Sequence, residues 1–314
     1  MEGRLKFHHA GKCLIPRGVW MARHFLADDD FSREEVERIF SLAADLKSRP
    51  VQPLLPSKNV ALVFSKPSTR TRVSFEVGMN QLGGAAIYLQ TGETQLRRGE
   101  TLADFAKTLS RYVQGVVARM ESQAELEELA SNSAVPVING LTGLWHPCQA
   151  LADLYTLREK KGRLDGLKLA FIGDGNSNVA RSLIRLGSKM GVQVAVASPK
   201  EFAPGKDALK GTKTKVTANP KEAAKGADAV YTDVWVSMGR EAEDEARKKL
   251  LKPYQVNGAL MKQAKKDALF MHCLPAHRGE EATNEVFSGK QSAVFDQAEN
   301  RLHVQKAVMV TLMR

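Results

Sequence analysis

Short apolar runs alternate along this chain with longer segments in which apolar residues recur every three or four positions. The runs are typical of buried parallel strands, and the longer segments are typical of helices that cover a sheet. Strands that alternate with helices predict an α/β fold built on doubly wound parallel sheets. We expect strands at 59–64, 85–89, 115–118, 135–138, 168–172, 193–197, 229–235 and 268–271.

Polar and special residues mark where several helices begin and end. Ser32, with Glu35 three residues later, forms a capping-box pattern that starts a helix reaching about Lys47. Gly83 is well placed to end the helix that follows the first strand. Further helices are predicted from Thr101, over 123–130, from Pro147, up to Met190, from Asn219 and over 297–312.

The segment 65–84 carries the strongest chemical signal, because hydroxyl and arginine side chains lie between a predicted strand and a predicted helix. Backbone N–H groups at a helix N-terminus, together with the helix dipole, favour an anion. Ser68, Thr69 and Thr71 add hydroxyl donors, and Arg70 and Arg72 add guanidinium groups that match phosphate oxygens. An ordinary helix cap followed by solvated arginines is the alternative, but so many donors in one turn favour an anion site.

Other polar residues follow predicted strands, at the edge where α/β sheets bind ligands. Arg119 ends one strand. His146 follows another strand at the start of a helix, with Gln149 one turn further along. A lone histidine is more often structural, but beside an oxyanion site His146 becomes a candidate hydrogen-bond donor to a carbonyl oxygen.

Length and charge narrow the class of protein. The 314 residues suit two domains, each with its own core. The formal charge of +11 is scattered, without a basic run interleaved with aromatic residues; it fits anionic small substrates equally well, and no nucleic-acid partner is expected. No apolar run is long enough to span a membrane. The widely spaced Cys13, Cys148 and Cys273 indicate neither a metal cluster nor a disulfide framework, which suggests a cytoplasmic protein.

Residues 1–20 differ from the rest of the chain. They are basic and lack a clear hydrophobic period, and their apolar runs are too short for a secretory signal. Met21 then opens a segment that looks like a natural protein start followed by a capped helix. We therefore expect residues 1–20 to be a disordered extension or the result of a misplaced start codon.

Gly173, Asp174 and Gly175, between a strand and a helix, invite a dinucleotide-binding interpretation. That fingerprint requires a third glycine, where Asn178 stands, and an acidic residue directly after the strand 193–197, where none occurs. A nicotinamide-dependent dehydrogenase is therefore disfavoured. The sequence also shows no spacing typical of a metal site.

Four motifs in this order, SKPSTRTR, HPCQALADL, DVWVSMG and HCLPAHRGEE, closely resemble those of the ornithine carbamoyltransferases. The resemblance runs from about Met21 to the C-terminus. It implies a two-domain α/β enzyme that forms homotrimers, uses no metal or organic cofactor, and makes L-citrulline and phosphate in arginine synthesis or the urea cycle. The implied domains are a carbamoyl phosphate-binding domain at 21–150, completed by the C-terminal helix 298–314, and an ornithine-binding domain at 151–297.

The resemblance also implies roles for individual residues. Arg70, Arg119, His146, Asp233 and Cys273 match the catalytic positions of the family. The carbamoyl phosphate positions are matched by Ser68, Thr69, Arg70, Thr71, Arg119, His146, Gln149, Cys273, Leu274 and Arg301. The L-ornithine positions are matched by Asn178, Asp233, Ser237 and Met238. The glycine-rich loop is one residue longer than in many relatives, so either Asn176 or Asn178 could meet ornithine, and we prefer Asn178.

Two alternatives remain open from the residues. One is a carbamoyltransferase for another amine, such as putrescine or an acylated ornithine. The other is a phosphate- or nucleic-acid-binding protein without catalytic activity, which predicts salt-sensitive binding of nucleic acid and no turnover.

Overall fold

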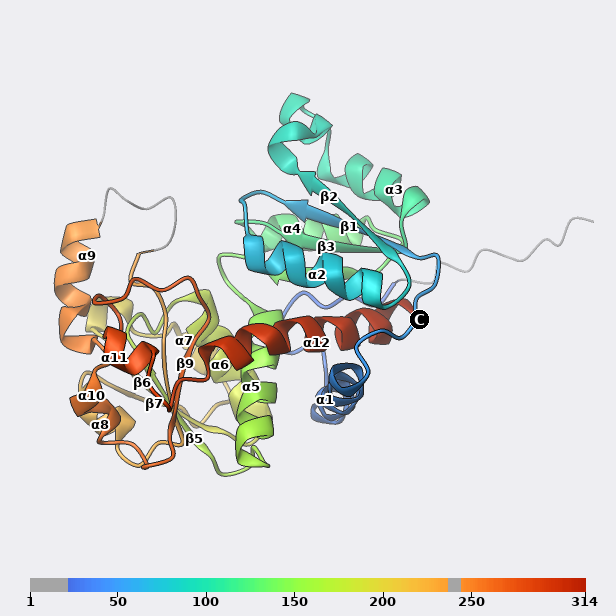
Figure 1. Ribbon diagram of the computed structural model, residues 1–314. Coiled ribbons are helices and arrows are strands. Elements are labelled where there is room, and N and C mark those ends of the chain that lie inside the picture. Colours follow the sequence, from blue (N-terminus) through green and yellow to red (C-terminus); the bar gives the residue numbers. More distant parts are fainter. Residues whose placement is uncertain (1–21, 237–243) are drawn as a thin grey trace, which may run out of the picture.

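A computed structural model describes residues 22–236 and 244–314 (Figure 1). The predicted extension 1–20 and the predicted ornithine contacts Ser237 and Met238 lie outside the described residues. The chain forms two parallel sheets, each covered by helices, which confirms the predicted α/β class with two doubly wound sheets.

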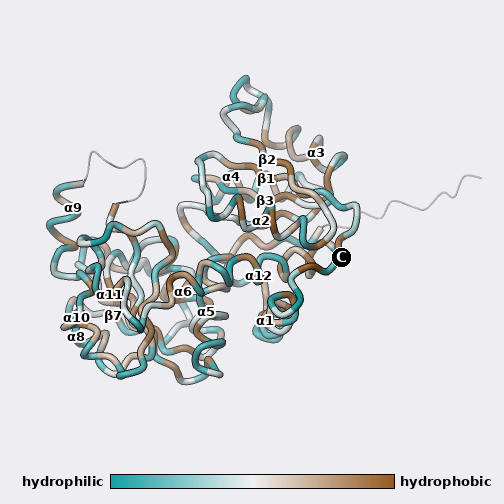
Figure 2. The backbone as a smooth tube through the Cα atoms, viewed as in Figure 1, coloured by the Kyte–Doolittle hydropathy of each residue, from teal (hydrophilic) through white to brown (hydrophobic). Residues whose placement is uncertain are grey.

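The first sheet has the strand order β2-β1-β3-β4, and all of its pairs are parallel. Its strands are β1 (Asn59–Phe64), β2 (Ala85–Gln90), β3 (Gly115–Arg119) and β4 (Val137–Leu141). The helices connecting them are α2 (Thr69–Gln81), α3 (Leu102–Tyr112) and α4 (Gln123–Ser131). β1, β3 and β4 are buried between helices on the two faces of the sheet, whereas the edge strand β2 is partly exposed; the tube in Figure 2 is largely brown along the buried strands.

The second sheet has the order β7-β6-β5-β8-β9, again parallel throughout. Its strands are β5 (Lys168–Ile172), β6 (Gln193–Ala197), β7 (Lys215–Thr217), β8 (Ala229–Thr232) and β9 (Leu269–His272). Its helices are α6 (Asn178–Lys189), α7 (Lys206–Leu209), α8 (Pro220–Ala224), α9 (Asp244–Leu251), α10 (Gly258–Met261) and α11 (Asn284–Phe287). In both sheets the strand order reverses beside the first strand of the unit, which is where α/β proteins bind ligands.

Three helices join the two parts of the molecule: α1 (Arg33–Ser48), α5 (Pro147–Lys161) and α12 (Val294–Met313). The last helix starts beside β9 and packs along α5, α1 and α2, so it crosses from the second sheet to the first (Figure 1). One apolar core continues from α1 and the first sheet through α5 to the second sheet. No helix among the described residues is long and apolar enough to cross a membrane.

Most predicted elements are present, with informative differences at their ends. The capping box of Ser32 and Glu35 is confirmed, and Gly83 ends α2 with φ +83°. The predicted strand 229–235 stops at Thr232, so the polar segment after it begins earlier than expected. The edge strand β7 was not predicted, because only three residues form it and their side chains are largely exposed.

Candidate active site

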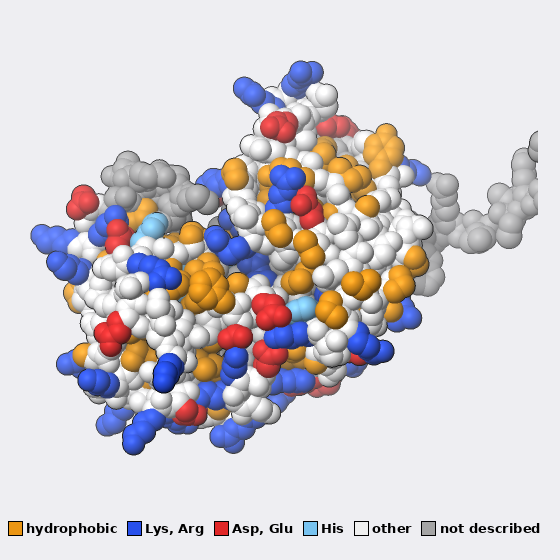
Figure 3. Space-filling view, in the orientation of Figure 1, with side chains coloured by type: hydrophobic (Ala, Val, Ile, Leu, Met, Phe, Trp, Pro, Cys, Tyr) orange, Lys and Arg blue, Asp and Glu red, His pale blue; other side chains and the backbone are white. Residues whose placement is uncertain are grey.

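The structure places the predicted site residues where strands of the two sheets end. β1 leads to Ser68, Thr69, Arg70 and Thr71, β3 ends at Arg119, β4 leads to His146 and Gln149, β5 leads to Asn178, β8 leads to Asp233, and β9 leads to Cys273 and Leu274. The two edges face each other: Cys273 on the second edge acts electrostatically on Arg119 of the first, and Arg301 acts on Cys273. Figure 3 shows Lys and Arg side chains in the hollow between the two parts of the molecule.

The N-terminus of α2 is open toward this hollow. Ser68 is the N-cap residue in extended conformation, but its side chain makes no capping hydrogen bond to any described residue. The Ser68 hydroxyl and the first N–H groups of the helix are therefore left for a ligand, and the dipole favours an anion there. Arg70 is half-buried on the first turn, whereas Thr71 is buried.

Arginines gather around this helix start. Arg119 pairs with Phe64 across β3 and β1, so it reaches the edge of the sheet beside the turn. Burial, together with the charges of Arg301 and Arg70, lowers the pKa of Arg119 to about 10. Burial also lowers the pKa of Arg301. Three mutually repelling guanidinium groups at one place are typical of a site that receives an anion.

Arg301 lies on α12 and is held by neutral side chains. Its Nη1 donates to Gln149 Oε1 at 2.5 Å, and its Nη2 donates to Thr71 Oγ1 at 3.0 Å. The C-terminal helix therefore brings an arginine to the first sheet, joining residues that are more than 150 positions apart. None of these partners neutralises the charge of the guanidinium.

His146 is buried at the start of α5 and is fixed through its backbone. Its N–H donates to Ser182 Oγ at 2.9 Å, and Ser182 donates to Asp28 at 2.8 Å. Burial, then the charges of Arg301 and Arg119, hold the pKa of His146 well below its usual range. The ring is therefore neutral at pH 7, and Nδ1 has no hydrogen-bond partner among the described residues. A neutral imidazole can donate one N–H to an oxygen without carrying charge.

The edge of the second sheet carries a thiol and a carboxyl group. Cys273 Sγ donates to Asp233 Oδ1 at 2.9 Å. Burial raises the pKa of both groups, and the Asp233 charge raises that of Cys273 further. Cys273 is therefore a thiol at neutral pH, which makes it a hydrogen-bond donor and excludes it as the base of a reaction.

The loop after β9 is held in an uncommon conformation. Leu274 has φ +60°, in the left-handed region that costs a non-glycine residue roughly 1–2 kcal/mol. Its N–H donates to His272 Nδ1 at 2.9 Å, and His272 Nε2 lies 3.2 Å from Glu281 Oε1. The buried His272–Glu281 pair thus stabilises the backbone beside Cys273.

The two candidate asparagines differ in their surroundings. Asn178 begins α6, and its Nδ2 donates to the carbonyl oxygen of Thr142 at 2.7 Å, so it bridges the segments after β5 and β4. Asn176 is exposed and accepts from Arg181 Nη1 at 2.8 Å. Asn178 is thus joined to the segment that leads from β4 to His146, whereas Asn176 is joined to α6.

The sequence analysis missed two buried residues that support the site. Asp153 accepts from Gln149 Nε2 at 2.7 Å and from Gln297 Nε2 at 2.6 Å. Asp153 lies four residues after Gln149, on the part of α5 from Pro147 to Leu157 that is buried throughout. In the sequence, the pair Gln149 and Asp153, one helical turn apart among apolar residues, was the available signal for this support.

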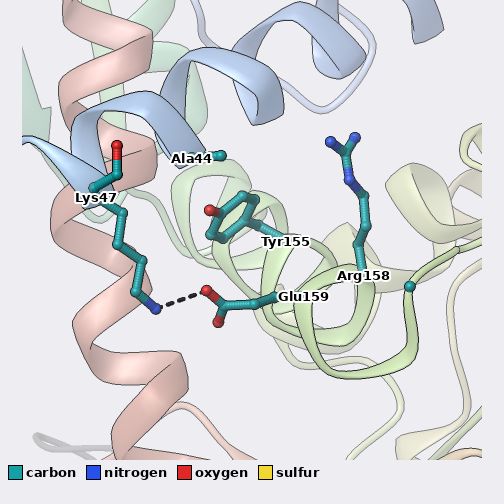
Figure 4. A pocket seen from close by; sticks show the side chains of 7 residues that line it. Ala44, Lys47, Tyr155, Arg158 and Glu159 are labelled. Carbon is teal, nitrogen blue, oxygen red and sulfur yellow. Dashed lines mark hydrogen bonds and ion pairs between the residues drawn. The ribbon is translucent and has the colours of Figure 1, made fainter.

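Two other places in the described part of the chain gather charged side chains, but neither resembles the site between the sheets. His277, Glu280 and Glu281 offer metal-ligand atoms within 4.8 Å of one another, but Glu281 Oε1 already accepts the His277 N–H at 2.6 Å. A cavity of about 430 Å³ lies away from the site, between α1 and α5 (Figure 4). There Lys47 donates to Glu159 at 2.8 Å and Arg158 donates to Glu37 at 2.5 Å, so neither cation resembles the unneutralised arginines of the site.

The sequence matches two family models that together span most of the chain. The model described as aspartate/ornithine carbamoyltransferase, carbamoyl-P binding domain, matches residues 23–159. The model described as aspartate/ornithine carbamoyltransferase, Asp/Orn binding domain, matches residues 165–312. The second match includes α12, although this helix packs mainly on α1, α2 and α5.

Individual relatives agree with these matches. A protein of Thermococcus kodakarensis named ornithine carbamoyltransferase is 52% identical over 305 residues, which cover 93% of this chain and 96% of the relative. A Bacillus subtilis protein of the same name is 50% identical over 293 residues, covering 90% and 92%. The solved ornithine carbamoyltransferase of Pyrococcus furiosus superposes with a TM-score of 0.89 at 49% identity, covering 93% of this chain and 97% of that one. With two matching family models and relatives at this identity, the chain belongs to the aspartate/ornithine carbamoyltransferase family.

Proposed function

We propose that this protein is an ornithine carbamoyltransferase, which transfers the carbamoyl group of carbamoyl phosphate to the δ-amine of L-ornithine and releases L-citrulline and phosphate. The observation that carries this proposal is a cluster of three arginines, two of which act on the neutral His146, facing the Cys273–Asp233 pair. The names of the relatives from Thermococcus kodakarensis and Bacillus subtilis support the same activity.

The phosphate group of the donor would bind at the N-terminus of α2. Ser68, Thr69 and Thr71 offer hydroxyl groups, Arg70 offers a guanidinium, and the helix N–H groups complete the site. A bound anion would reduce the repulsion among the arginines. We therefore expect carbamoyl phosphate to bind first and ornithine second, with the two parts of the molecule closing around them.

The carbonyl oxygen of the carbamoyl group would lie among Arg119, His146, Thr71 and Arg301. This oxygen becomes an oxyanion when the amine attacks, and fixed donors stabilise that charge more than they stabilise the substrate. Removing one such donor typically costs about 3–4 kcal/mol of transition-state stabilisation. Gln149 would hold the carbamoyl amide, and Cys273 and Leu274 would contact both substrates.

On the ornithine side, Asn178 and Asp233, together with Ser237 and Met238 outside the described residues, would bind the amino acid. The δ-nitrogen must lose a proton before attack because an ammonium has no lone pair. The new C–N bond then forms, the bond between the carbonyl carbon and the phosphate oxygen breaks, and its electron pair leaves with phosphate. Asp233 and the departing phosphate are the candidate proton acceptors, whereas Cys273 stays protonated.

The remaining parts of the proposal concern organisation. We propose a carbamoyl phosphate-binding domain at 21–150 with the helix 298–314, an ornithine-binding domain at 151–297, and a homotrimer or a multiple of trimers in the cytoplasm. Exposed Val73 and Val77 on α2, and Ile87 on the neighbouring edge strand β2, support an interface on the first sheet. A native mass measurement tests the subunit number. The relative from Pyrococcus furiosus named as anabolic supports a role in arginine biosynthesis.

Purified protein supplied with carbamoyl phosphate and a panel of amines tests the activity. We expect citrulline from ornithine, and little product from putrescine, aspartate or acetylated ornithine. Turnover with another amine and none with ornithine would reassign the substrate. Salt-sensitive binding of nucleic acid without any turnover would favour a non-catalytic protein.

A further inference from the structure

Four buried polar side chains form a connected hydrogen-bond network where α5 and α12 cross, and Gln297 Nε2 also donates to Tyr231 Oη at 3.0 Å. Gln149 and Asp153 are one turn apart on α5, and Gln297 and Arg301 are one turn apart on α12. Arg301 donates to Gln149 at 2.5 Å, and Gln297 donates to Asp153 at 2.6 Å. All four side chains are at most 5% exposed.

Asp153 determines which way both glutamine amides point. An amide group has a donor end and an acceptor end, whereas the Asp153 Oδ1 atom accepts at both contacts. Gln149 Nε2 and Gln297 Nε2 both donate to this Oδ1, at 2.7 Å and 2.6 Å. The oxygen of each amide must therefore point away from Asp153.

Each amide oxygen reaches a different half of the active site. Gln149 Oε1 accepts from Arg301 and retains a second lone pair for a ligand. Gln297 Oε1 accepts the backbone N–H of His272 at 3.0 Å, at the start of the loop that carries Cys273. The second end of the network thus lies on the ornithine side, one residue before the thiol.

The orientation of Gln149 suits the chemistry of a carbamoyl group. A carbamoyl group presents an NH₂ group, which only donates, so it needs an acceptor such as Gln149 Oε1. If the Gln149 amide were reversed, its NH₂ group would face the NH₂ group of carbamoyl phosphate and the guanidinium of Arg301, and none of these groups can accept a hydrogen bond. A donor carrying methyl in place of NH₂, such as acetyl phosphate, would leave this oxygen with an unused lone pair.

Resting on the proposed function, we propose that Asp153 is a positioning residue that selects a carbamoyl donor by fixing the acceptor end of Gln149 toward the donor site. Through Gln297 the same carboxyl group holds the loop that carries Cys273. Burial raises the pKa of Asp153 to about 7, and Oδ1 remains an acceptor whether or not the group is protonated.

Binding of two donors to the wild type and to Asp153→Leu tests donor selection. Calorimetry gives the dissociation constants of carbamoyl phosphate and acetyl phosphate, and inorganic phosphate reports whether the anion site is intact. We expect the preference for carbamoyl phosphate over acetyl phosphate to fall about tenfold in Asp153→Leu, which is the effect of losing one oriented hydrogen bond. Phosphate affinity should change little. Asp153→Asn, which keeps one acceptor oxygen, should lose less, and it serves as the deciding variant if Asp153→Leu does not fold.

Gln297→Leu separates the two branches of the network. It should raise the KM for ornithine severalfold while leaving the donor preference unchanged, because the Gln149–Asp153 contact remains. Asp228→Asn is a matched control, since Asp228 is another buried carboxylate. It accepts from the N–H of Lys168, the first residue of β5, at 2.9 Å and from Lys265 Nζ at 2.6 Å. This substitution should lower thermal stability without changing the donor preference.

Folded Asp153→Leu and Asp153→Asn variants that keep the wild-type donor preference would overturn the proposal. An equal loss of preference in Asp228→Asn would also overturn it, because the effect would then be general destabilisation. The donor preference is a binding measurement, so it stands apart from turnover. If the wild type binds carbamoyl phosphate selectively but forms no citrulline, the proposed function fails while the role of Asp153 stands.

Discussion

The two facing edges of the sheets differ in how their charges are balanced. On the first edge, burial and the charges of Arg301 and Arg70 lower the pKa of Arg119, and among the described residues Arg301 donates only to neutral side chains. On the second edge, Asp233 accepts from the Cys273 thiol, and Asp174 forms an ion pair with Arg247. The first edge therefore gains from binding an anion, whereas on the second edge Asp174 is neutralised by Arg247, and Asp233, which contacts a neutral thiol, can accept from an ammonium group. Ligands of opposite character, a phosphate and an amine, fit this contrast.

The largest expected effect is at the cationic edge. Arg70→Ala should lower kcat/KM at least a hundredfold, because a guanidinium matched to phosphate oxygens would be lost. Its melting temperature should stay close to that of the wild type, since Arg70 is only half-buried. Steady-state assays and thermal melting measure the two effects.

Arg72→Ala is the control for that change. Arg72 donates to Glu76 at 2.9 Å and stacks 3.9 Å from the centre of the Tyr88 ring, so it is already engaged on the side of α2. We expect its loss to lower kcat/KM less than tenfold. Near-normal turnover in a well-folded Arg70→Ala protein would contradict the role given to the first edge.

The second edge should respond more weakly and mainly toward the amine. Cys273→Ala should raise the KM for ornithine about tenfold and the KM for carbamoyl phosphate by a smaller factor. Cys273→Ser should recover part of the loss, since a hydroxyl also donates to Asp233. Because the pKa of Cys273 is raised well above its usual range, iodoacetamide should alkylate it slowly at pH 8. Rapid alkylation of Cys273 at pH 8 would show that it is a thiolate and would contradict its assignment as a hydrogen-bond donor.

The charge contrast itself can be followed at His146. Its pKa is held low by burial and by the arginines, so the ring should stay neutral as the pH falls through 6.5. Inorganic phosphate should raise this pKa, because an anion offsets the neighbouring charges. NMR titration of the imidazole carbons, assigned with His146→Asn, measures both. An unchanged titration at saturating phosphate would place the anion away from this edge.

The smallest expected effect on activity comes from the other buried cation of α12. Lys306 donates to the carbonyl oxygens of Leu46 and Pro50 and to Gln81, next to the C-terminal end of α1, where a cation is favoured. Lys306→Met should lower stability by about 1–3 kcal/mol by leaving these acceptors unpaired, and turnover of the folded protein should not change.

The pH dependence of the free energy of unfolding should also differ between the wild type and Lys306→Met. Burial lowers its pKa from 10.5 to about 8 in the folded protein, so the unfolded chain binds a proton more readily between those values. The folded wild type should therefore gain stability as the pH rises through this window, and Lys306→Met should lack that gain. Denaturant melts at pH 7.5 and 10 compare the two proteins.

Much of this molecule follows from local sequence patterns. The strand, turn and helix around Ser68 to Thr71 were predicted because apolar period, capping residues and donor density agree within one short segment. The edge strand β7 and the early end of β8 were not predicted, because the formation and length of short strands depend on pairing with neighbouring strands. The hydrogen bonds by which Asp153 and Gln297 support Gln149 could not be predicted from the sequence for a related reason. The pair Asp153–Gln297 is separated by 144 positions and meets only when α5 and α12 cross.

The helix α12 has a consequence for the order in which the protein becomes competent during synthesis. A ribosome releases the first sheet, α2 and α5 long before it releases Arg301. Until then the buried partners Gln149 and Thr71 lack their donor, and the surface of β3 that approaches Met313 so closely at Gly115 stays uncovered. We expect the nascent chain to bind its anion weakly and to be open to chaperones until the final helix docks. The set of hydrogen-bond donors in the proposed active site is therefore complete only after α12 has been translated and has docked.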